Sequence, residues 1–203
     1  LLDNLIASNL VSAIHLVNRK PHANSHTKVS QHQVDFEKPI QLDNEPNFDL
    51  AFCCLGTTIK KAGSKAAFEN VDFQYVAQFA QLAKQHNCQQ FAVISSIGAN
   101  PIKGGFYLQT KGRMEAHLQS MEWPSLYIFR PSLLTGKRQE FRLGEQLGSI
   151  FGKLISPFLV GPLHKYRPIN MNKVASAMAA ILTAESNSGV KVLEGDDILK
   201  LAN

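Results

Sequence analysis

Disulfide bonds, a metal centre and a membrane helix all lack support in this sequence. It has three cysteines in 203 residues, and Cys53 and Cys54 are adjacent in an apolar run. An odd number with that spacing argues against disulfides and favours the reducing cytoplasm as the location. The seven histidines show no metal-ligand spacing with the cysteines. The longest apolar stretch, 150–163, is shorter than the ~18 residues of a membrane helix and is broken by a lysine and two prolines, so no membrane partner is expected.

A glycine-rich phosphate-binding turn is also absent. The glycines at 104–105 and at 144, 148 and 152 lack the Gly-x-x-Gly-x-x-Gly spacing and follow no strand. The sequence starts at Leu1 with the apolar spacing of a helix and without a leading strand. We therefore expect the natural protein to extend upstream by one strand and this turn.

The excess of positive charge is small and dispersed. The formal net charge is +5, with a sequence pI near 9.1. The 21 basic residues occur as scattered pairs rather than as a run. This pattern favours a mildly basic enzyme with an anionic cofactor over a nucleic-acid-binding protein.

Short apolar strands alternate with amphipathic helices along the chain. Strands are expected at 13–17, 29–34, 48–55, 91–94, 125–129 and 190–194, and helices at 1–8, 68–86, 107–118 and 174–183. The alternation predicts a Rossmann-like α/β fold, a doubly wound parallel sheet with helices on both faces. We expect one domain spanning 1–203, in which 137–170 forms a small substrate-side extension.

A Tyr-x-x-x-Lys motif, Tyr107 to Lys111, follows the strand that ends at Ser95 and Ser96. Residues four apart on a helix share one face, and a lysine ammonium beside a phenol favours the phenolate. A serine hydroxyl after the strand can polarise a substrate carbonyl while the tyrosine exchanges a proton. Because successive strand residues point to opposite faces, only one serine should enter the site. We favour Ser96, with Ser95 as the alternative.

Other strand ends indicate a cofactor site, because ligands of open α/β sheets bind at the carboxyl ends of the strands. Arg19 and Lys20 follow the strand 13–17, where an NAD-preferring protein usually has an acid. Two cations favour the 2′-phosphate of NADP. Gly56 follows the strand 48–55 and would let the backbone approach a flat cofactor. Arg142, in a basic loop, could reach a phosphate or a substrate anion, or could be a solvated loop residue.

Together these residues resemble the short-chain dehydrogenase/reductase superfamily, whose classical members pair a serine after one strand with Tyr-x-x-x-Lys on the next helix. The chain is more similar to the atypical branch of the Tat-interacting, oxidoreductase-like tumour suppressor and its bacterial NAD(P)-binding relatives. The resemblance is carried by Cys-Cys-Leu-Gly-Thr-Thr at 53–58, Lys-Ala-Gly at 61–63, Tyr-Leu-Gln-Thr-Lys-Gly at 107–112, Phe-Arg-Pro at 129–131 and Arg-Gln-Glu at 138–140.

The resemblance implies an NADP-binding Rossmann fold and a set of site residues. The implied cofactor contacts are Arg19, Lys20, Leu55, Gly56, Lys111, Leu133 and Arg142, and the implied catalytic residues are Tyr107, as proton donor and acceptor, with Lys111 as its partner. The branch also includes proteins that act as binding or regulatory proteins.

The leading hypothesis is an NADP(H)-dependent reductase or dehydrogenase of a small organic carbonyl or alcohol, with Ser96, Tyr107 and Lys111 as catalytic residues. A second hypothesis is an NADPH-binding regulatory or scaffold protein without turnover, which offers a surface to a protein partner or to another copy of itself. A third is a nucleotide-sugar epimerase or dehydratase, which would use the same tyrosine and lysine.

Overall fold

A computed structural model describes residues 1–42, 47–136, 166–183 and 189–202. The strands in these ranges are β1 (Ile14–Asn18), β2 (Val29–Gln33), β3 (Leu50–Cys53), β4 (Gln90–Ile94), β5 (Ser125–Arg130), β6 (Leu134–Thr135), β7 (Ile169–Asn170) and β8 (Gly189–Glu194). The helices are α1 (Leu2–Ala7), α2 (Ile59–Ala62), α3 (Lys65–Glu69), α4 (Tyr75–Gln85), α5 (Phe106–Ser120), α7 (Met171–Ala180) and α8 (Gly195–Leu201). A π-helical segment, Asn70–Gln74, joins α3 to α4, and a 3-10 turn, Ile181–Thr183, follows α7.

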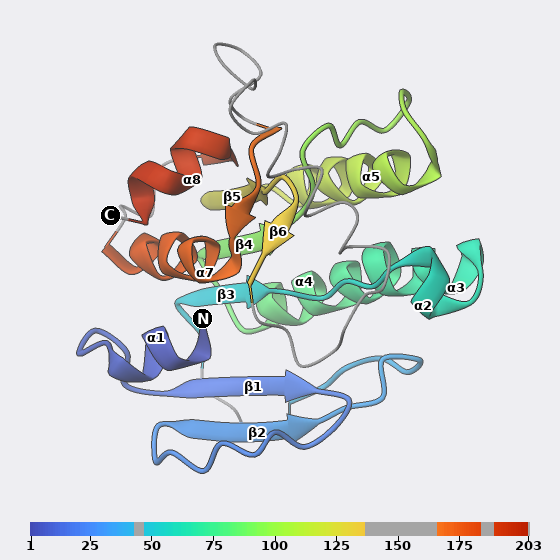
Figure 1. The fold of residues 1–203 in the computed structure, drawn as a ribbon. Coiled ribbons are helices and arrows are strands. Elements are labelled where there is room, and N and C mark those ends of the chain that lie inside the picture. The colour runs from blue at the N-terminus through green and yellow to red at the C-terminus, as the bar shows by residue number, and fades with distance from the viewer. Residues whose placement is uncertain (43–46, 137–165, 184–188, 203) are drawn as a thin grey trace.

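The strand pairs of the described residues are all parallel, but they form three separate sheets. The main sheet has the order β3-β4-β5-β8. The strands β1 and β2 pair with each other from Ile14 opposite Val29 to Asn18 opposite Gln33. The strands β6 and β7 form a two-residue ladder. Figure 1 shows β1 beneath β3, and in the described ranges no ladder joins these two neighbouring edges.

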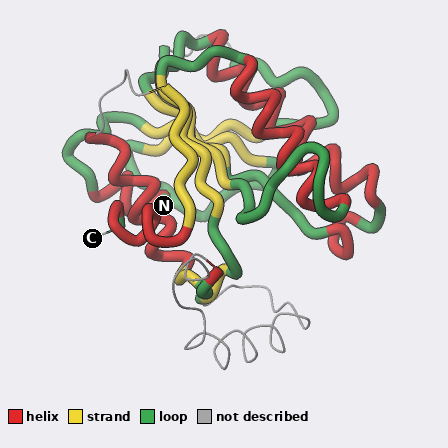
Figure 2. The backbone as a smooth tube through the Cα atoms, turned by 90° about the horizontal axis from the view of Figure 1, so that it is seen from above, coloured by secondary structure: helices red, strands yellow, loops and turns green. Residues whose placement is uncertain are grey.

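Helices cover the main sheet on both faces, as Figures 1 and 2 show. On one face, α4 and α5 bury the side chains of Phe91, Val93, Leu126 and Ile128. On the other face, α7 and α8 bury the alternate residues of the same strands, among them Tyr127 and Phe129. The helix α1 joins this second layer, where Asn4 Nδ2 lies 3.5 Å from Ser176 Oγ. The strands are therefore apolar on both sides, as strands of a parallel sheet between two helical layers must be.

The sequence-based boundaries agree with the structure to within a few residues for the expected strands and for most of the helices. The expected helix 68–86 is divided, because the π-helical segment interrupts it between α3 and α4. The helices α2 and α8 and the short strands β6 and β7 were not predicted. Each is too short to show a clear period in its own sequence.

Residues 137–165 contain most of the expected substrate-side extension, and they lie outside the described part of the chain. None of the helices described in the structure is long and apolar enough to cross a membrane.

Candidate functional site

The predicted site residues that the structure describes lie at or beyond the carboxyl ends of the parallel strands. Arg19 follows β1, Gly56 follows β3, Ser96 follows β4 and Leu133 follows β5. The helix α5 brings Tyr107 and Lys111 to the same edge, since Lys111 Nζ lies 3.5 Å from the carbonyl oxygen of Ile94, the last residue of β4. This edge is where open α/β sheets bind their ligands.

Lys111 is held in a buried ion pair. Its Nζ lies 2.7 Å from Oδ1 of Asp72, and the two side chains are only 3% and 1% exposed. The other carboxylate oxygen of Asp72 accepts a hydrogen bond of 2.7 Å from the backbone N–H of Thr57. A buried charge is tolerated only when it is paired and hydrogen-bonded, and this arrangement meets both conditions. The lysine is therefore fixed in place rather than free to move in solvent.

Gly56 lies over this ion pair. A Cβ atom added at Gly56 would meet Asp72 Oδ1 at 3.5 Å and Lys111 Nζ at 3.9 Å. The ammonium and the carboxylate thus lie close to the backbone of Gly56, which is exposed between two half-buried neighbours. The pair itself is shielded from solvent, whereas Gly56 is exposed.

Tyr107 stands one helical turn before Lys111 and is 37% exposed. Its ring packs against Phe68, with ring centroids 5.6 Å apart. Within the described residues its hydroxyl makes no hydrogen bond, neither to Lys111 nor to another side chain. The Tyr107 side chain is therefore partly exposed, and its ring is held by the contact with Phe68.

Gly112 allows the loop after β4 to approach α5 closely. A Cβ atom at Gly112 would lie 2.2 Å from the carbonyl carbon of Asn100 and 2.3 Å from the nitrogen of Pro101. The backbone N–H of Asn100 also donates to the carbonyl of Leu108 at 3.1 Å. Only glycine permits this approach. The glycine that follows the Tyr-x-x-x-Lys motif thus fixes the distance between the serine loop and the helix that carries the tyrosine.

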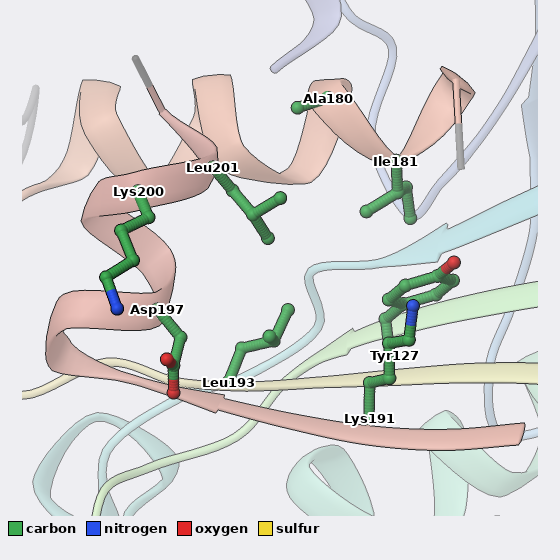
Figure 3. Close-up of a pocket in the computed structure, with 8 residues that line it drawn as sticks. All are labelled: Tyr127, Ala180, Ile181, Lys191, Leu193, Asp197, Lys200 and Leu201. Carbon is green, nitrogen blue, oxygen red and sulfur yellow. The ribbon is translucent and has the colours of Figure 1, made fainter. Parts of the chain in front are cut away.

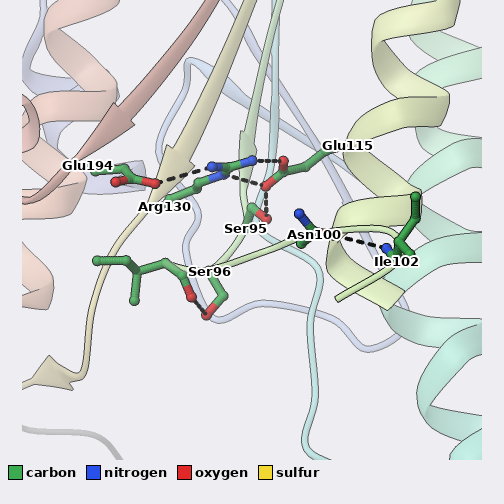
Figure 4. Close-up of polar contacts among 8 residues, drawn as sticks. Ser95, Ser96, Asn100, Ile102, Glu115, Arg130 and Glu194 are labelled. Atoms are coloured by element: carbon green, nitrogen blue, oxygen red, sulfur yellow. Dashed lines mark hydrogen bonds and ion pairs between the residues drawn. The ribbon is translucent and has the colours of Figure 1, made fainter. Parts of the chain in front are cut away.

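The two serines after β4 have different environments (Figure 4). Ser95 is buried and donates a short hydrogen bond to Glu115 Oε1. Glu115 is also paired with Arg130, whose Nε donates to Oε1 at 2.9 Å and whose Nη2 donates to Oε2 at 2.5 Å. Arg130 reaches Glu194 as well, at 3.2 Å. These acceptors raise the pKa of the Arg130 guanidinium, chiefly through the hydrogen bonds to Glu115.

Ser96 is half-buried and lies outside this network. Its hydroxyl donates a long contact of 3.4 Å to the carbonyl of Ile97 (Figure 4). Ser95 is thus engaged in a structural network, while Ser96 keeps a weakly bound hydroxyl at the same edge. The preference for Ser96 over Ser95 as the catalytic serine stays a prediction.

The remaining predicted cofactor contacts lie on several loops. Arg19 and Lys20 are exposed, and the carbonyl of Arg19 accepts from Gln33 Nε2 at 3.2 Å. Leu55 is half-buried and packs against two of the three apolar clusters. Leu133 is 36% exposed, and its carbonyl accepts from Ile169 at 3.0 Å. Arg142 lies outside the described residues.

Asp72 and Glu115 are the residues that sequence reasoning missed. A signal for Asp72 was available, because positions 68, 72, 76 and 80 form one helical stripe and the other three are fully buried. An acid in an apolar stripe has to find a partner. Glu115 follows Lys111 by four residues on the buried side of α5. It is likewise an acid among buried positions, which indicates that it needs a partner.

Away from this edge, the described residues include few groups suited to catalysis or metal binding. No group of three or more metal-ligating side chains occurs there. The thiols of Cys53 and Cys88 are buried, and burial raises the pKa of Cys53 to about 12 and that of Cys88 to about 11. A cavity of about 290 Å³ lies on the face of the sheet that α7 and α8 cover. It lies between β8 and these helices, with Lys191, Asp197 and Lys200 at its wall (Figure 3). It contains none of the predicted site residues.

Comparison with solved structures defines the class of this fold. MoeE5 in complex with UDP-glucose and NAD matches 98% of this chain and 77% of its own, with a TM-score of 0.64 at 12% identity. RMD from Pseudomonas aeruginosa complexed with NADPH matches 89% of this chain and 77% of its own, with a TM-score of 0.58 at 16% identity. The protein therefore has a Rossmann-like α/β fold, which confirms the predicted fold class.

Sequence comparison identifies the family. Protein HTATIP2 of Rattus norvegicus is 36% identical over 99% of this chain and 83% of its own length. The mitochondrial protein FMP52 of Candida albicans is 31% identical over 76% of this chain and 69% of its own length. No family model matches. The chain belongs to the HTATIP2 family of atypical short-chain dehydrogenases/reductases, as the motif resemblance predicted. The cytoplasmic location stays a prediction, since the fungal relatives are named as mitochondrial.

Proposed function

We propose that this protein is an NADP(H)-dependent oxidoreductase that transfers a hydride to or from a small organic carbonyl or alcohol. The observation that carries the proposal is the arrangement on α5. An exposed tyrosine, Tyr107, stands one turn from Lys111, whose ammonium is fixed at the end of β4. The family relationship and the NAD and NADPH named with the structural neighbours support a nicotinamide cofactor.

The residues at the carboxyl edge fit such a cofactor. Gly56 has no side chain and lies next to the Lys111–Asp72 pair, so its exposed backbone would contact the flat ring. Arg19 and Lys20 are exposed cations after β1, in the position that favours a 2′-phosphate over a 2′-hydroxyl. When bound, the nicotinamide supplies or accepts the hydride. The preference for NADP therefore depends on the basic turn, and the orientation of the ring depends on the loop at Gly56.

The side chains would then divide the acid and base chemistry. Ser96 would donate a hydrogen bond to the substrate oxygen. Tyr107 would give a proton to that oxygen during reduction and take one during oxidation. The Lys111 ammonium would stabilise the phenolate form, and Asp72 would keep that ammonium in place.

Cofactor preference is tested by titrating the protein with NADPH and NADH. We expect tighter binding of NADPH, and we expect the double variant Arg19→Ala/Lys20→Ala to lose this preference. The matched control, Lys173→Ala/Lys200→Ala, removes two exposed cations from α7 and α8 and should keep the preference. A clear preference of the natural protein for NADH would overturn the proposed role of the basic turn.

Turnover is tested with the variant Tyr107→Phe, which keeps the ring contact with Phe68. We expect NADPH binding to persist and the reduction of a panel of small aldehydes and ketones to fall by about 100-fold or more. An unchanged reduction rate in this variant would contradict the catalytic proposal. It would favour a regulatory NADPH-binding protein that docks a protein partner. Ser96→Ala should lower turnover with little loss of stability.

A nucleotide-sugar reaction is the other enzyme activity to test. Several structural neighbours are described in complex with nucleotide sugars, including UDP-glucose and UDP-glucuronic acid. At 12–13% identity these matches support the fold and leave the substrate open. Epimerisation of UDP-glucose by the natural protein, with no NADPH consumed, would favour this alternative.

A further inference from the structure

The helix α5 carries three functional side chains at a spacing of four residues: Tyr107, Lys111 and Glu115. Side chains four apart lie along one face of a helix, and each step advances about 6 Å along its axis. Tyr107 is partly exposed, whereas Lys111 and Glu115 are buried. Glu115 accepts a hydrogen bond from Ser95, the neighbour of Ser96 (Figure 4). The helix with the candidate tyrosine thus also holds the strand end with the candidate serine.

Ser96 is held by its neighbours more than by its own side chain. The N–H of Ser95 donates to the carbonyl of Phe129 at 2.7 Å, and the Ser95 hydroxyl donates to the carboxylate on α5. The N–H of Ile97 donates to the carbonyl of Pro131 at 3.1 Å. The hydroxyl of Ser96 itself makes a contact of 3.4 Å, which is long for a hydrogen bond between two oxygens. The position of this hydroxyl therefore depends on the anchors on both sides of it.

An ion pair fixes the direction of the Ser95 anchor. Arg130 binds both carboxylate oxygens of Glu115, at 2.9 and 2.5 Å, which holds the carboxylate in one orientation. The oxygen Oε1 accepts from the guanidinium and from the Ser95 hydroxyl. A buried ion pair is often no more stabilising than a well-packed apolar pair. A need to orient Ser95 thus explains this pair better than a gain in stability does.

We propose that Ser95 and Glu115 are positioning residues for Ser96, a role that rests on the proposed function. They fix the strand end so that the Ser96 hydroxyl can meet the substrate oxygen together with Tyr107, and neither of them touches the substrate. A hydroxyl assists only within about 2.6–3.2 Å of the reacting group, and a misplacement of about 1 Å can cost about 100-fold in rate. The two serines after β4 then have separate tasks, one as anchor and one as hydrogen-bond donor.

The role is tested by a double-mutant cycle on turnover, with NADPH and the most active carbonyl of the aldehyde and ketone panel. Ser95→Ala removes the anchoring hydroxyl and leaves the pair of Glu115 and Arg130 in place. We expect it to lower kcat by about tenfold, with the KM for NADPH unchanged. In the Ser96→Ala background the same change should alter kcat by less than about twofold, because the group that it positions is gone.

Equal losses of kcat in both backgrounds would show a merely structural effect and would overturn the proposal. An unchanged kcat in the single variant Ser95→Ala would overturn it as well. The conservative variant Ser95→Thr keeps the hydroxyl and should lower kcat by about threefold or less.

Glu115→Gln is a second variant, in which the amide keeps an acceptor oxygen but loses the charge that holds Arg130. It should lower kcat, and this loss should also disappear in the Ser96→Ala background. Glu194→Gln is the matched control, because Glu194 pairs with the same guanidinium from β8, at 3.2 Å. It should change kcat by less than about twofold. If both variants lowered kcat equally, the effect would belong to Arg130 alone and the proposal would be overturned.

Amide hydrogen exchange, followed by NMR, provides a readout that needs no turnover. The N–H of Ala99 donates to the carbonyl of Ser96 at 3.1 Å, and that of Ile97 is bonded on the other side. Ser95→Ala should speed exchange at Ile97 and Ala99 by about tenfold and leave the amide of Val93, within β4, unchanged. Unchanged exchange at Ile97 and Ala99 would overturn the positioning role. An unaltered protein without turnover would contradict the proposed function, and the exchange rates would still decide whether Ser95 fixes Ser96.

Discussion

The ammonium of Lys111 lies 2.7 Å from the carboxylate of Asp72, with both side chains shielded from solvent. The pair joins α5 to the π-helical segment before α4, and Thr57 ties the same carboxylate to the loop after β3. The carboxylate of Asp72 thus connects three elements of the candidate site: α5, the π-helical segment and the loop after β3. The lysine of the motif has a structural role even before a cofactor is considered.

The first prediction concerns this pair. Asp72→Asn leaves the buried ammonium without a counter-charge and should lower the free energy of unfolding by about 3–5 kcal/mol. In the double variant Asp72→Asn/Lys111→Met no buried charge remains, so much of the loss should be recovered while turnover stays low. Urea unfolding of both variants provides the measurement. A loss below about 1 kcal/mol for the single variant would contradict the assigned role.

The second prediction compares the two acidic partners of Arg130. Glu115 is 3% exposed and binds the guanidinium through both oxygens, whereas Glu194 is 22% exposed and binds through one. Glu115→Gln should therefore cost about 3 kcal/mol or more, and Glu194→Gln less than about 1 kcal/mol. The comparison uses thermal and urea unfolding of both variants. Equal losses would show that burial does not set the strength of these contacts.

The third prediction concerns the close approach at Gly112. In an exposed helix interior, glycine to alanine would stabilise the helix by about 1 kcal/mol. Here the added methyl would overlap Asn100 and Pro101, so Gly112→Ala should destabilise by about 3 kcal/mol or more and displace the loop after β4. Gly105→Ala is the matched control, because no atom lies within 4 Å of its Cβ position. It should change stability by about 1 kcal/mol or less.

The fourth prediction concerns stability at alkaline pH. Burial raises the pKa of Cys53 from its ordinary 9.0 to about 12, and that of Cys88 to about 11. Above pH 9.0 the unfolded chain releases these protons while the folded protein retains them, so the unfolded state gains stability. The free energy of unfolding should fall by up to about 1.4 kcal/mol per pH unit for each thiol above that value.

The corresponding measurement is urea unfolding between neutral pH and the alkaline limit of reversibility. Cys53→Ala should reduce the slope of stability against pH, and Cys88→Ala should reduce it over a narrower range because its pKa is raised less. The slopes are compared rather than the absolute stabilities, since each substitution also changes packing. An unchanged slope in both variants would assign the alkaline loss to other groups.

Local periodicity was enough to predict most of the elements. Strand 91–94 and helix 107–118 were predicted within a few residues, because apolar spacing and flanking turn residues are properties of the local sequence. The division of the strands into separate sheets was not predicted from periodicity, because strand pairing depends on residues far apart in the chain. Reading strand ends in order placed the motif correctly at the carboxyl edge, since that rule depends only on parallel topology.

The partners of the motif were harder to predict than the motif itself. Tyr107 and Lys111 were found by their spacing, whereas Asp72 lies 39 positions before Lys111 and meets it only through packing. Ser95 and Ser96 differ in sequence by nothing but their order. Their environments differ because the fold places Glu115 next to Ser95, where Glu115 is also paired with Arg130.

The π-helical segment Asn70–Gln74 has a consequence for comparing this protein with others. Each wide turn holds one residue more than an α-helical turn, so the segment acts as a one-residue insertion within an otherwise regular helix. A relative that has an unbroken helix here should align with a single-residue gap between positions 70 and 74. The position of that gap thus becomes a marker by which members of this family can be sorted.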